Sequence, residues 1–347
     1  MSSWSLSGCS VGYLLQAAHG QWQLLHARQP IARLIAAPDT DAELKRRLEL
    51  VNEARDFATR ELALPDNQSY RSYSALGRPY VVWNVVAAPE FSIAPLRWCF
   101  PISGCVAYRG YFREDHARRF AARLSQRGND TLVAGVSAYS TLGRFADPLL
   151  DTMLRYGDLE LVATIFHELA HQLVYVQDDS EFNEAFAMSV ERAGVARWLE
   201  AHSRHDELAG YQQRQEQQAH IVQLLGAGRA QLAELYAQAQ LSPRSPGSQQ
   251  SLAELRARKQ ALIGRTSAAV RDYELQENLR SGYSSWLEAG LNNAHLASVA
   301  TYFDCVPGFE RLLGEQGGDL KAYYAAVRAL ARGPAASRRA WCTRLRP

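Results

Sequence analysis

The sequence has no long hydrophobic run and no excess of charge of either sign. No stretch of its 347 residues reaches the roughly eighteen consecutive apolar residues that a membrane-spanning helix needs, so we expect no spanning segment in the printed chain. Its 38 Lys and Arg residues nearly balance 36 Asp and Glu residues, and no basic stripe is interleaved with aromatic residues. This composition argues against a dedicated nucleic-acid-binding protein and favours a globular one.

Cysteine is also scarce, with five residues in all. If Cys9 is set aside, the even number that remains suits an oxidising compartment. Cys99 and Cys105 flank a short segment with a Pro and a Gly, which predicts a disulfide between them. Cys305 and Cys342 would then pair by elimination. Buried free thiols are the alternative.

The N-terminal segment Leu6-Ser7-Gly8-Cys9-Ser10 resembles a bacterial lipobox, in which the cysteine carries the lipid. This resemblance implies membrane association through a lipid anchor at Cys9, on the periplasmic side of a bacterial envelope. Only five residues precede Leu6 and none is Lys or Arg, so the signal peptide is incomplete in this chain. An ordinary exposed tail is the alternative.

The most informative stretch is Thr164 to Gln172, which carries an H-E-x-x-H pattern within an apolar run compatible with a helix. Residues four apart lie on one helix face, about 6 Å apart along its axis, so His167 and His171 can direct two imidazoles to one point. Glu168 is then placed to reach a metal-bound water. Because such residues are costly to bury unless they are paired or hold a cation, we predict a zinc site. A hydrogen-bonded histidine pair is the alternative.

A second helix is expected directly after a turn at Asp178-Asp179-Ser180, with Ser180 as its cap. So short a connection makes the two helices pack against each other. Glu184 and Glu191 lie two turns apart on one face of this helix, and either can face the histidines. The spacing alone leaves this choice open.

The rest of the chain predicts a mostly helical α+β fold with a small mixed sheet and a long helical hairpin. Helices are expected at 11–35, 39–62, 114–127, 292–313 and 319–331, with one more beginning at Asp147-Pro148; strands are expected at 80–87, 93–108 and 131–139. The hairpin spans 203–241 and 250–280, and we interpret it as a structural or partner-binding arm. This divides the chain into a tail (1–10), a catalytic core (11–200), the hairpin arm (201–282) and a C-terminal helical part that completes the core (283–347).

Two families share these motifs. The chain resembles a family of predicted bacterial aminopeptidases with zincin-type sites, often lipoprotein-like, through segments spread along most of its length: 12–13, 64–67, 104–112, 138–143, 167–172 and 182–187. Locally it is also similar to the gluzincin aminopeptidases of the alanyl type. His167 to Gln172 matches their metal motif, and Asn183-Glu184-Ala185-Phe186-Ala187 differs at one position from their Asn-Glu-Gly-Phe-Ala motif for the third ligand.

The resemblance implies a zincin-like metallopeptidase with one zinc ion per chain, held by His167, His171 and Glu184, with Glu191 in reserve. An open fourth position would take water, with Glu168 as the general base. Candidates for stabilising the oxyanion are Tyr302, Tyr283 and His295, and candidates for orienting the histidines are Asn183 and Glu191.

Substrate binding is expected at Thr141, Leu142 and Gly143. In zinc peptidases of this build an edge strand beside the metal helix pairs with the substrate backbone, and Gly143 would permit close approach. An ordinary connection is the alternative. The chain has no counterpart of the alanyl-type Gly-Ala-Met-Glu-Asn strand, whose glutamate binds the substrate amine, and its interval from His171 to Glu184 is shorter.

Three functions therefore remain open. The first is a zinc aminopeptidase that acts on peptides. The second is an endopeptidase or oligopeptidase of the cell envelope, which remains open because the acidic anchor is missing. The third is a zinc-binding envelope scaffold lipoprotein without turnover, which docks a protein partner through the hairpin.

Overall fold

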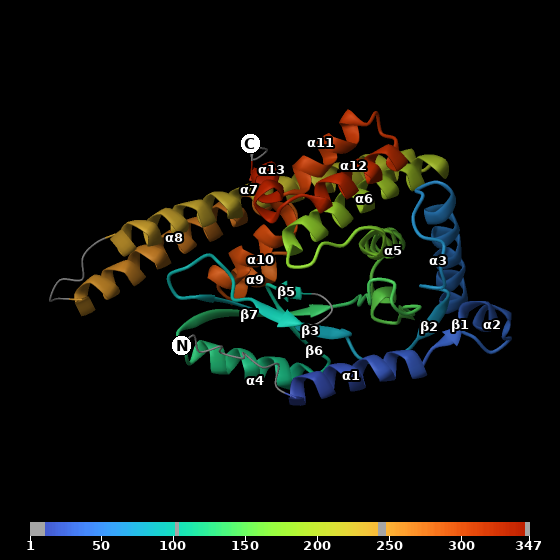
Figure 1. The fold of residues 1–347 in the computed structure, drawn as a ribbon, viewed down its shortest axis with the longest axis horizontal. Coiled ribbons are helices and arrows are strands. Elements are labelled where there is room, and N and C mark those ends of the chain that lie inside the picture. The colour runs from blue at the N-terminus through green and yellow to red at the C-terminus, as the bar shows by residue number, and fades with distance from the viewer. Residues whose placement is uncertain (1–10, 101–103, 242–247, 344–347) are drawn as a thin grey trace.

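The structure is a computed structural model that describes residues 11–100, 104–241 and 248–343, and it shows a mostly helical α+β fold with small sheets (Figure 1). This confirms the predicted class. The lipobox-like segment with Cys9, and residues 242–247 between the arms of the hairpin, lie outside the described residues. No helix in the described ranges is long and apolar enough to cross a membrane.

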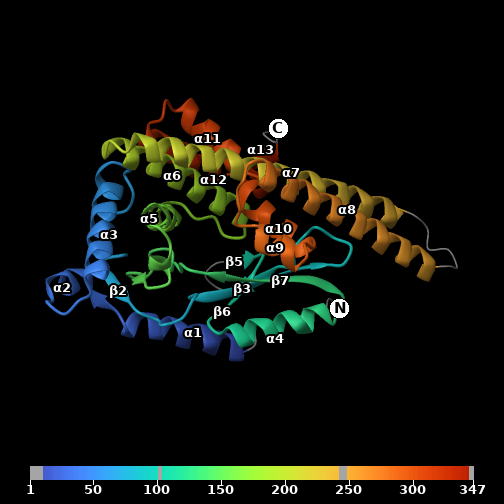
Figure 2. The same ribbon diagram turned by 180° about the vertical axis from the view of Figure 1, so that it is seen from behind.

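The central sheet has β3 (Val82–Pro89) between β6 (Arg109–Tyr111) and β7 (Asn129–Val136), both antiparallel to it. β3 forms where the sequence is rich in β-branched and aromatic residues, as predicted. Helix α4 (Glu114–Ser125) packs on one face of this sheet and α10 (Asn293–Phe303) on the other (Figures 1 and 2). Both faces of β3 are therefore covered, which explains why most of its residues are buried.

The prediction that residues 93–108 return alongside β3 is wrong. β4 (Trp98–Phe100) pairs instead with β5 (Gly104–Val106), and β6 supplies the partner of β3. The predicted disulfide between Cys99 and Cys105 closes this hairpin, and Gly104 has a φ of +72° that favours glycine. Leu96 N–H reaches Ala87 O of β3 at 2.7 Å, but the residues after it fold into this separate hairpin and do not continue along β3. The second predicted disulfide, between Cys305 and Cys342, is also confirmed.

A second small sheet interrupts the predicted helix at 11–35. Helix α1 (Val11–His26) is followed by β1 (Gln29–Pro30), α2 (Ile31–Ala36) and α3 (Ala42–Arg60). A proline inside a helix removes a hydrogen bond and disfavours helical backbone in the residue before it, so Pro30 breaks the helix. β1 pairs antiparallel with β2 (Ser72–Ser74), and β2 pairs parallel with β8 (Leu149–Leu150).

The expectation of a helix that begins at Asp147-Pro148 is also wrong, because β8 occupies that position. A short 3-10 turn (Met153–Arg155) separates β8 from α5 (Asp158–Leu173). The Asp147 carboxylate does not cap a helix; it accepts hydrogen bonds from the backbone N–H and the hydroxyl of Thr141, at 2.9 and 2.7 Å. Arg46 and Arg47 instead fix the start of α5, through ion pairs with Asp158 of 2.6 and 2.9 Å.

Helices α5 and α6 (Ser180–Ala201) form the centre of the main hydrophobic core. Phe166 of α5 and Phe186 of α6 are fully buried, and each such burial contributes roughly 2 kcal/mol. The helices approach closely at Gly194, where an added Cβ would lie 2.7 Å from Phe166 Cδ2 and 2.8 Å from Leu62 Cδ1. The spacing of the two helices therefore depends on the absence of a side chain at this position.

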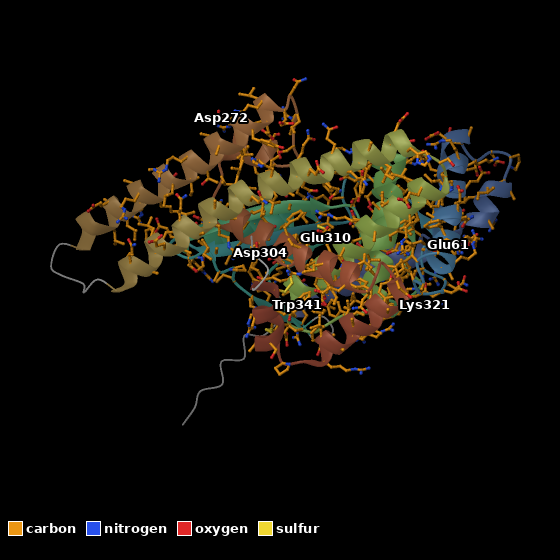
Figure 3. All side chains as sticks on the ribbon, turned by 90° about the horizontal axis from the view of Figure 1, so that it is seen from above. Glu61, Asp272, Asp304, Glu310, Lys321 and Trp341 are labelled. Atoms are coloured by element: carbon orange, nitrogen blue, oxygen red, sulfur yellow. A yellow bond between two sulfur atoms is a disulfide. The ribbon has the colours of Figure 1, made fainter. Side chains whose placement is uncertain are left out.

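Helices α7 (His205–Leu241) and α8 (Ser248–Gln276) lie side by side and extend away from the body (Figure 3). They share a separate core that includes Leu225, Leu232, Tyr236, Ile263 and Val270. The hairpin is fastened to the end of the central sheet by buried Lys259, whose Nζ lies 2.7 Å from Asp130 Oδ2.

The C-terminal part contains α9 (Ser284–Ala289), α10, α11 (Val306–Glu315), α12 (Leu320–Arg332) and α13 (Ala335–Thr343). Helices α11, α12 and α13 contribute to the main core, whereas α9 contacts α8 and α10 packs against α6, α7 and the central sheet. The single helix predicted at 292–313 is divided between α10 and α11. Pro307 lies in the first turn of α11, where its missing N–H costs nothing, so a new helix starts there.

Candidate metal centre

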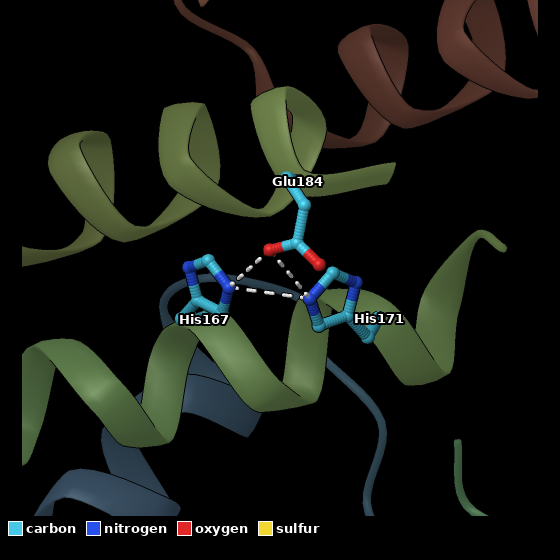
Figure 4. A group of neighbouring side chains, drawn as sticks. All are labelled: His167, His171 and Glu184. Carbon is cyan, nitrogen blue, oxygen red and sulfur yellow. Dashed lines mark hydrogen bonds and ion pairs between the residues drawn. The ribbon is translucent and has the colours of Figure 1, made fainter. Parts of the chain in front are cut away.

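Three side chains from α5 and α6 converge on one point, as Figure 4 shows. The Nε2 atoms of His167 and His171 lie 3.2 Å apart. Glu184 Oε2 lies 3.4 Å from the first and 3.7 Å from the second. All three side chains are largely shielded from solvent. The histidines point to one place because four residues separate them on a helix.

The triangle formed by these atoms matches a tetrahedral zinc site. Zinc–nitrogen and zinc–oxygen bonds of about 2.0–2.1 Å in tetrahedral geometry place neighbouring ligand atoms about 3.3–3.5 Å apart. The observed separations of 3.2, 3.4 and 3.7 Å bracket that value. Two imidazole nitrogens and one carboxylate oxygen are also a donor set that zinc prefers, so the residues present fit this ion.

Asn183 directs Glu184 toward the histidines by shaping the turn between the two helices. Its Oδ1 accepts a hydrogen bond from Val176 N–H at 2.8 Å, and its Nδ2 donates to Val176 O at 2.7 Å. The turn is thereby folded back on the first helical turn of α6. Asn183 thus contacts backbone and orients neither histidine. The helix cap is also displaced from the expected Ser180: the Asp179 side chain accepts from Phe182 N–H.

Glu191 contacts His167 from the other side of the ring. Its Oε2 lies 2.9 Å from His167 Nδ1, while Glu184 faces Nε2. A carboxylate beside Nδ1 keeps the proton on that nitrogen and leaves the Nε2 lone pair for a metal. Glu191 is therefore placed to orient a ligand, and its alternative role as the third ligand is not supported by this geometry.

The charges of the triangle stabilise one another. Burial alone lowers the pKa of His167, but its hydrogen bonds with Glu184 and Glu191 outweigh burial and raise that pKa above the usual value. Burial conversely raises the pKa of Glu184, and the nearby His171 and His167 more than reverse this. The carboxylate is therefore ionised at neutral pH, as a metal ligand must be, whereas His167 must release its Nε2 proton when a metal binds.

A cavity of about 730 Å³ opens onto the triangle, and Glu168 lines it beside the two histidines. Burial raises the pKa of Glu168, with a partial opposing effect from His171 and His167. A carboxyl with a raised pKa in a shielded cavity is suited to proton transfer near neutral pH. The walls are mainly apolar and aromatic and include Phe100, Val106, Phe112, Tyr139 and Phe145.

Two partly buried tyrosines line this cavity near the ligands. Glu184 and then burial raise the pKa of Tyr302, and burial followed by Glu184 raises the pKa of Tyr108. Both phenols therefore stay protonated and can donate hydrogen bonds. Tyr302 was a candidate from the sequence, whereas Tyr108 was missed as an individual residue, although it belongs to a segment that carries the family resemblance.

The other two oxyanion candidates, Tyr283 and His295, are not among the described residues that line this cavity. Tyr283 packs into the core of the hairpin. His295 stacks edge-on against Trp286, and its Nδ1 lies 2.8 Å from Asn292 Oδ1. Burial lowers the pKa of His295 to about 4, so it is neutral at physiological pH.

Residues 138–145 do not form the expected edge strand. β7 ends at Val136, and the segment continues as a turn in which Leu142 and Gly143 have φ values of 58° and 75°. Asp147 holds this turn through Thr141. Thr141 and Leu142 line the cavity, while Gly143 lies against Gln172, where an added Cβ would meet the side chain at 3.4 Å.

Comparison with known protein families agrees with this geometry. The family described as "Putative aminopeptidase" matches residues 12–342, which is nearly the whole chain. The chain belongs to this family. A search of curated proteins and a search of solved structures give no match. The family relationship therefore indicates a peptidase of the aminopeptidase kind.

Proposed function

We propose that this family member is a zinc-dependent peptide hydrolase of the aminopeptidase type, with a zincin-like site. The observation that carries the proposal is the triangle of His167, His171 and Glu184, whose edges bracket the ligand separation expected for tetrahedral zinc. The cavity that opens onto the triangle would leave room for a water molecule and a substrate beside the three ligands, as a catalytic site needs.

The residues of the cavity divide the chemistry among them. A zinc ion, when bound, lowers the pKa of water and polarises the peptide carbonyl. Glu168 accepts a proton from the attacking water and passes it to the leaving nitrogen. Tyr302, with Tyr108 beside it, donates a hydrogen bond to the oxygen on which negative charge develops. Glu191 holds His167 in the tautomer that presents Nε2.

Metal analysis with a hydrolysis assay tests this proposal. We expect one zinc per chain in the purified protein, no zinc in Glu184→Ala, and full zinc but a rate lowered roughly 10²–10⁴-fold in Glu168→Gln. Glu160→Gln is the matched control, because Glu160 is an exposed glutamate on the same helix. A Glu168→Gln protein with normal turnover, or a Glu184→Ala protein that retains its zinc, would contradict the proposal. If Glu168→Gln left a cellular phenotype unchanged, the scaffold function would be favoured.

An endopeptidase or oligopeptidase is the second candidate. It is favoured because the acidic residues of the cavity all have other roles. In the described chain those that line it are Glu168, Glu184 and Glu191, and each already has a role at the triangle. The segments outside the described ranges contain no Asp or Glu. No carboxylate is thus left to bind a substrate amine. Hydrolysis of N-acetylated peptides at rates similar to free ones would establish this function, and strict dependence on a free amine would exclude it.

The cellular setting forms part of the same proposal. A lipid on Cys9 would hold the protein at the periplasmic face of a bacterial envelope. Expression behind a complete lipoprotein signal peptide tests this: the parent protein should fractionate with membranes, and Cys9→Ser should be released. Equal membrane association of both proteins would exclude the anchor.

A further inference from the structure

A second cavity, of about 420 Å³, lies between α1, β6 and α4. Its wall includes Tyr13 from α1, Arg109 from β6, and His116, Arg119 and Arg123 from α4. Tyr13 also lines the larger cavity, so the two are neighbours. The chemistry of the smaller cavity is different, because the described residues that line it include three arginines and a histidine but no Asp or Glu.

Arg109 is held rigidly in this wall by aromatic rings. Its guanidinium carbon lies 4.1 Å from the ring centre of Tyr13 and 4.8 Å from that of Phe120. Arg123 lies over the same Phe120 ring, at 5.6 Å. Burial raises the pKa of Tyr111, while Arg109 and Arg123 both act to lower it. Both cations are therefore close enough to influence the same phenol.

Neither of these arginines forms an ion pair within the ranges that the structure describes, although their neighbours do. Arg118 pairs with Glu114 at 2.6 Å, and Arg119 pairs with Asp115 at 2.8 Å. The nearby acids of α4 are therefore already engaged. Arg109 Nε is buried and has no hydrogen-bond partner. Two like charges beside one ring repel each other, so an anion bound between the two guanidinium groups would relieve that repulsion.

We propose that this cavity binds a phosphate group. Guanidinium groups fixed by aromatic stacking present planar pairs of donors that match phosphate oxygens. Two unpaired cations, with His116 beside them, balance the two negative charges of a phosphate monoester better than the single charge of a carboxylate. The phosphate can come from a soluble phosphate ester or from a phospholipid headgroup. This site does not depend on zinc or on peptide hydrolysis.

Titration calorimetry with inorganic phosphate at constant ionic strength tests the site. We expect saturable binding of phosphate to the unmodified protein. In Arg109→Gln and in Arg123→Gln the affinity for phosphate should fall by roughly tenfold or more. Arg118→Gln is the matched control, because Arg118 is an exposed arginine of the same helix that does not line the cavity, and it should bind within about twofold of the parent. Arg123 is exposed, so its variant keeps the fold even if Arg109→Gln does not.

Vesicle sedimentation distinguishes the two sources of phosphate. The probes are phosphatidylcholine vesicles with and without about 25 mol % phosphatidic acid, whose headgroup is a phosphate monoester. Binding to the anionic vesicles that is lost in Arg123→Gln but kept in Arg118→Gln assigns the site to a lipid headgroup. Saturable binding of inorganic phosphate without preference for these vesicles assigns it to a soluble ester. If the parent binds neither probe, or if Arg123→Gln binds as well as Arg118→Gln, the proposal is wrong.

Discussion

Tyr302 and Tyr108 reach the cavity from distant parts of the chain, and their hydroxyls are the strongest donor candidates there. We expect Tyr302→Phe to lower kcat roughly 10²–10³-fold with little change in KM or zinc content, because a donor to the developing oxyanion acts mainly in the transition state. Tyr283→Phe is the control, since Tyr283 lies in the hairpin core. Steady-state kinetics on a peptide substrate measures both variants.

The outcome also discriminates between the two tyrosines. If Tyr302→Phe keeps its kcat and Tyr108→Phe loses it, the donor is Tyr108. If neither variant loses activity, the oxyanion is stabilised without a phenol, and the proposed division of roles in the cavity is incorrect.

Glu191 should influence metal affinity although it does not contact the metal position. Loss of a carboxylate that orients a ligating histidine typically lowers metal affinity by about 10–100-fold. We expect that loss in Glu191→Ala and a smaller one in Glu191→Gln, whose amide oxygen can still accept from His167 Nδ1–H. Competition with a chromophoric chelator measures the affinity. Glu200→Gln, an exposed position on the same helix, should match the parent; equal weakening there would point to a general charge effect.

For individual residues, the sequence predicted those side chains whose relative positions a single helix determines. His167, Glu168 and His171 are four or fewer positions apart, so their arrangement follows from the helical repeat. The roles of Glu184 and Glu191 depend on how α6 packs, and spacing alone could not separate them. Tyr302 and Tyr283 looked equivalent in the sequence because only the packing of α10 and of the hairpin places one in the cavity and the other outside it.

Among the elements, the junction of α8 with α9 depends on one carboxylate. Glu274 accepts hydrogen bonds from the backbone N–H of Ser281 at 3.0 Å, from its hydroxyl, and from the Ser284 hydroxyl at 2.7 Å. Burial raises the pKa of Glu274, but these hydrogen bonds outweigh burial and the pKa is lowered. The stabilisation is therefore present above the unfolded-state pKa of about 4.5 and is lost as pH falls through the folded-state pKa.

We expect Glu274→Gln to lower the free energy of unfolding by about 2–3 kcal/mol at pH 7. The difference from the parent should shrink as the pH is reduced below about 4.5, because the parent then loses the same charge. Urea denaturation at several pH values measures it. Glu254→Gln, exposed on the same helix, should change stability little at any pH. A difference for Glu274→Gln that stays constant with pH would contradict this account.

Element boundaries were predictable where local chemistry determines them and not where tertiary contacts do. The helix predicted at 39–62 starts close to its expected position, because the Asp41 side chain caps α3 and its Oδ1 accepts from Leu44 N–H at 2.9 Å. Pro30 breaks the first predicted helix, a signal that was present in the sequence but outweighed by the apolar periodicity around it. Asp147 was interpreted as the start of a helix because its contact with Thr141 depends on a turn that local periodicity does not show.

For the molecule as a whole, the two disulfides should differ in their contribution to stability. The chain-entropy model gives about 4 kcal/mol for a loop like that between Cys305 and Cys342, with its sequence separation of 37. It gives about 2 kcal/mol for the Cys99–Cys105 loop, with its separation of 6. Urea denaturation of the two double Cys→Ser variants should show this order.

The effect of these variants on hydrolysis should be the reverse. Phe100 and Val106, which flank the Cys99–Cys105 loop, line the candidate cavity, whereas Cys305–Cys342 joins the beginning of α11 to α13. We therefore expect the Cys99/Cys105 variant to raise KM and the Cys305/Cys342 variant to leave KM unchanged in the folded protein. An unchanged KM in the first variant would show that this hairpin does not contact substrate.

The sequence indicated the class of fold and the long hairpin, because helix lengths and composition are local properties. It did not indicate how the parts assemble. The pairing of β2 with β8 joins residues 73 and 149, and the contact between Lys259 and Asp130 connects α8 to the sheet. Such long-range contacts leave no periodic signal in a single sequence.

The helices that carry the three proposed ligands are held together by their own packing, which includes the close approach at Gly194 and the contact between Asn183 and Val176. A zinc ion would therefore join a scaffold that is already complete. In a zinc-deficient cell we expect this protein to accumulate in a folded, protease-resistant and inactive form. It should become active within the time that an ion takes to diffuse into the cavity.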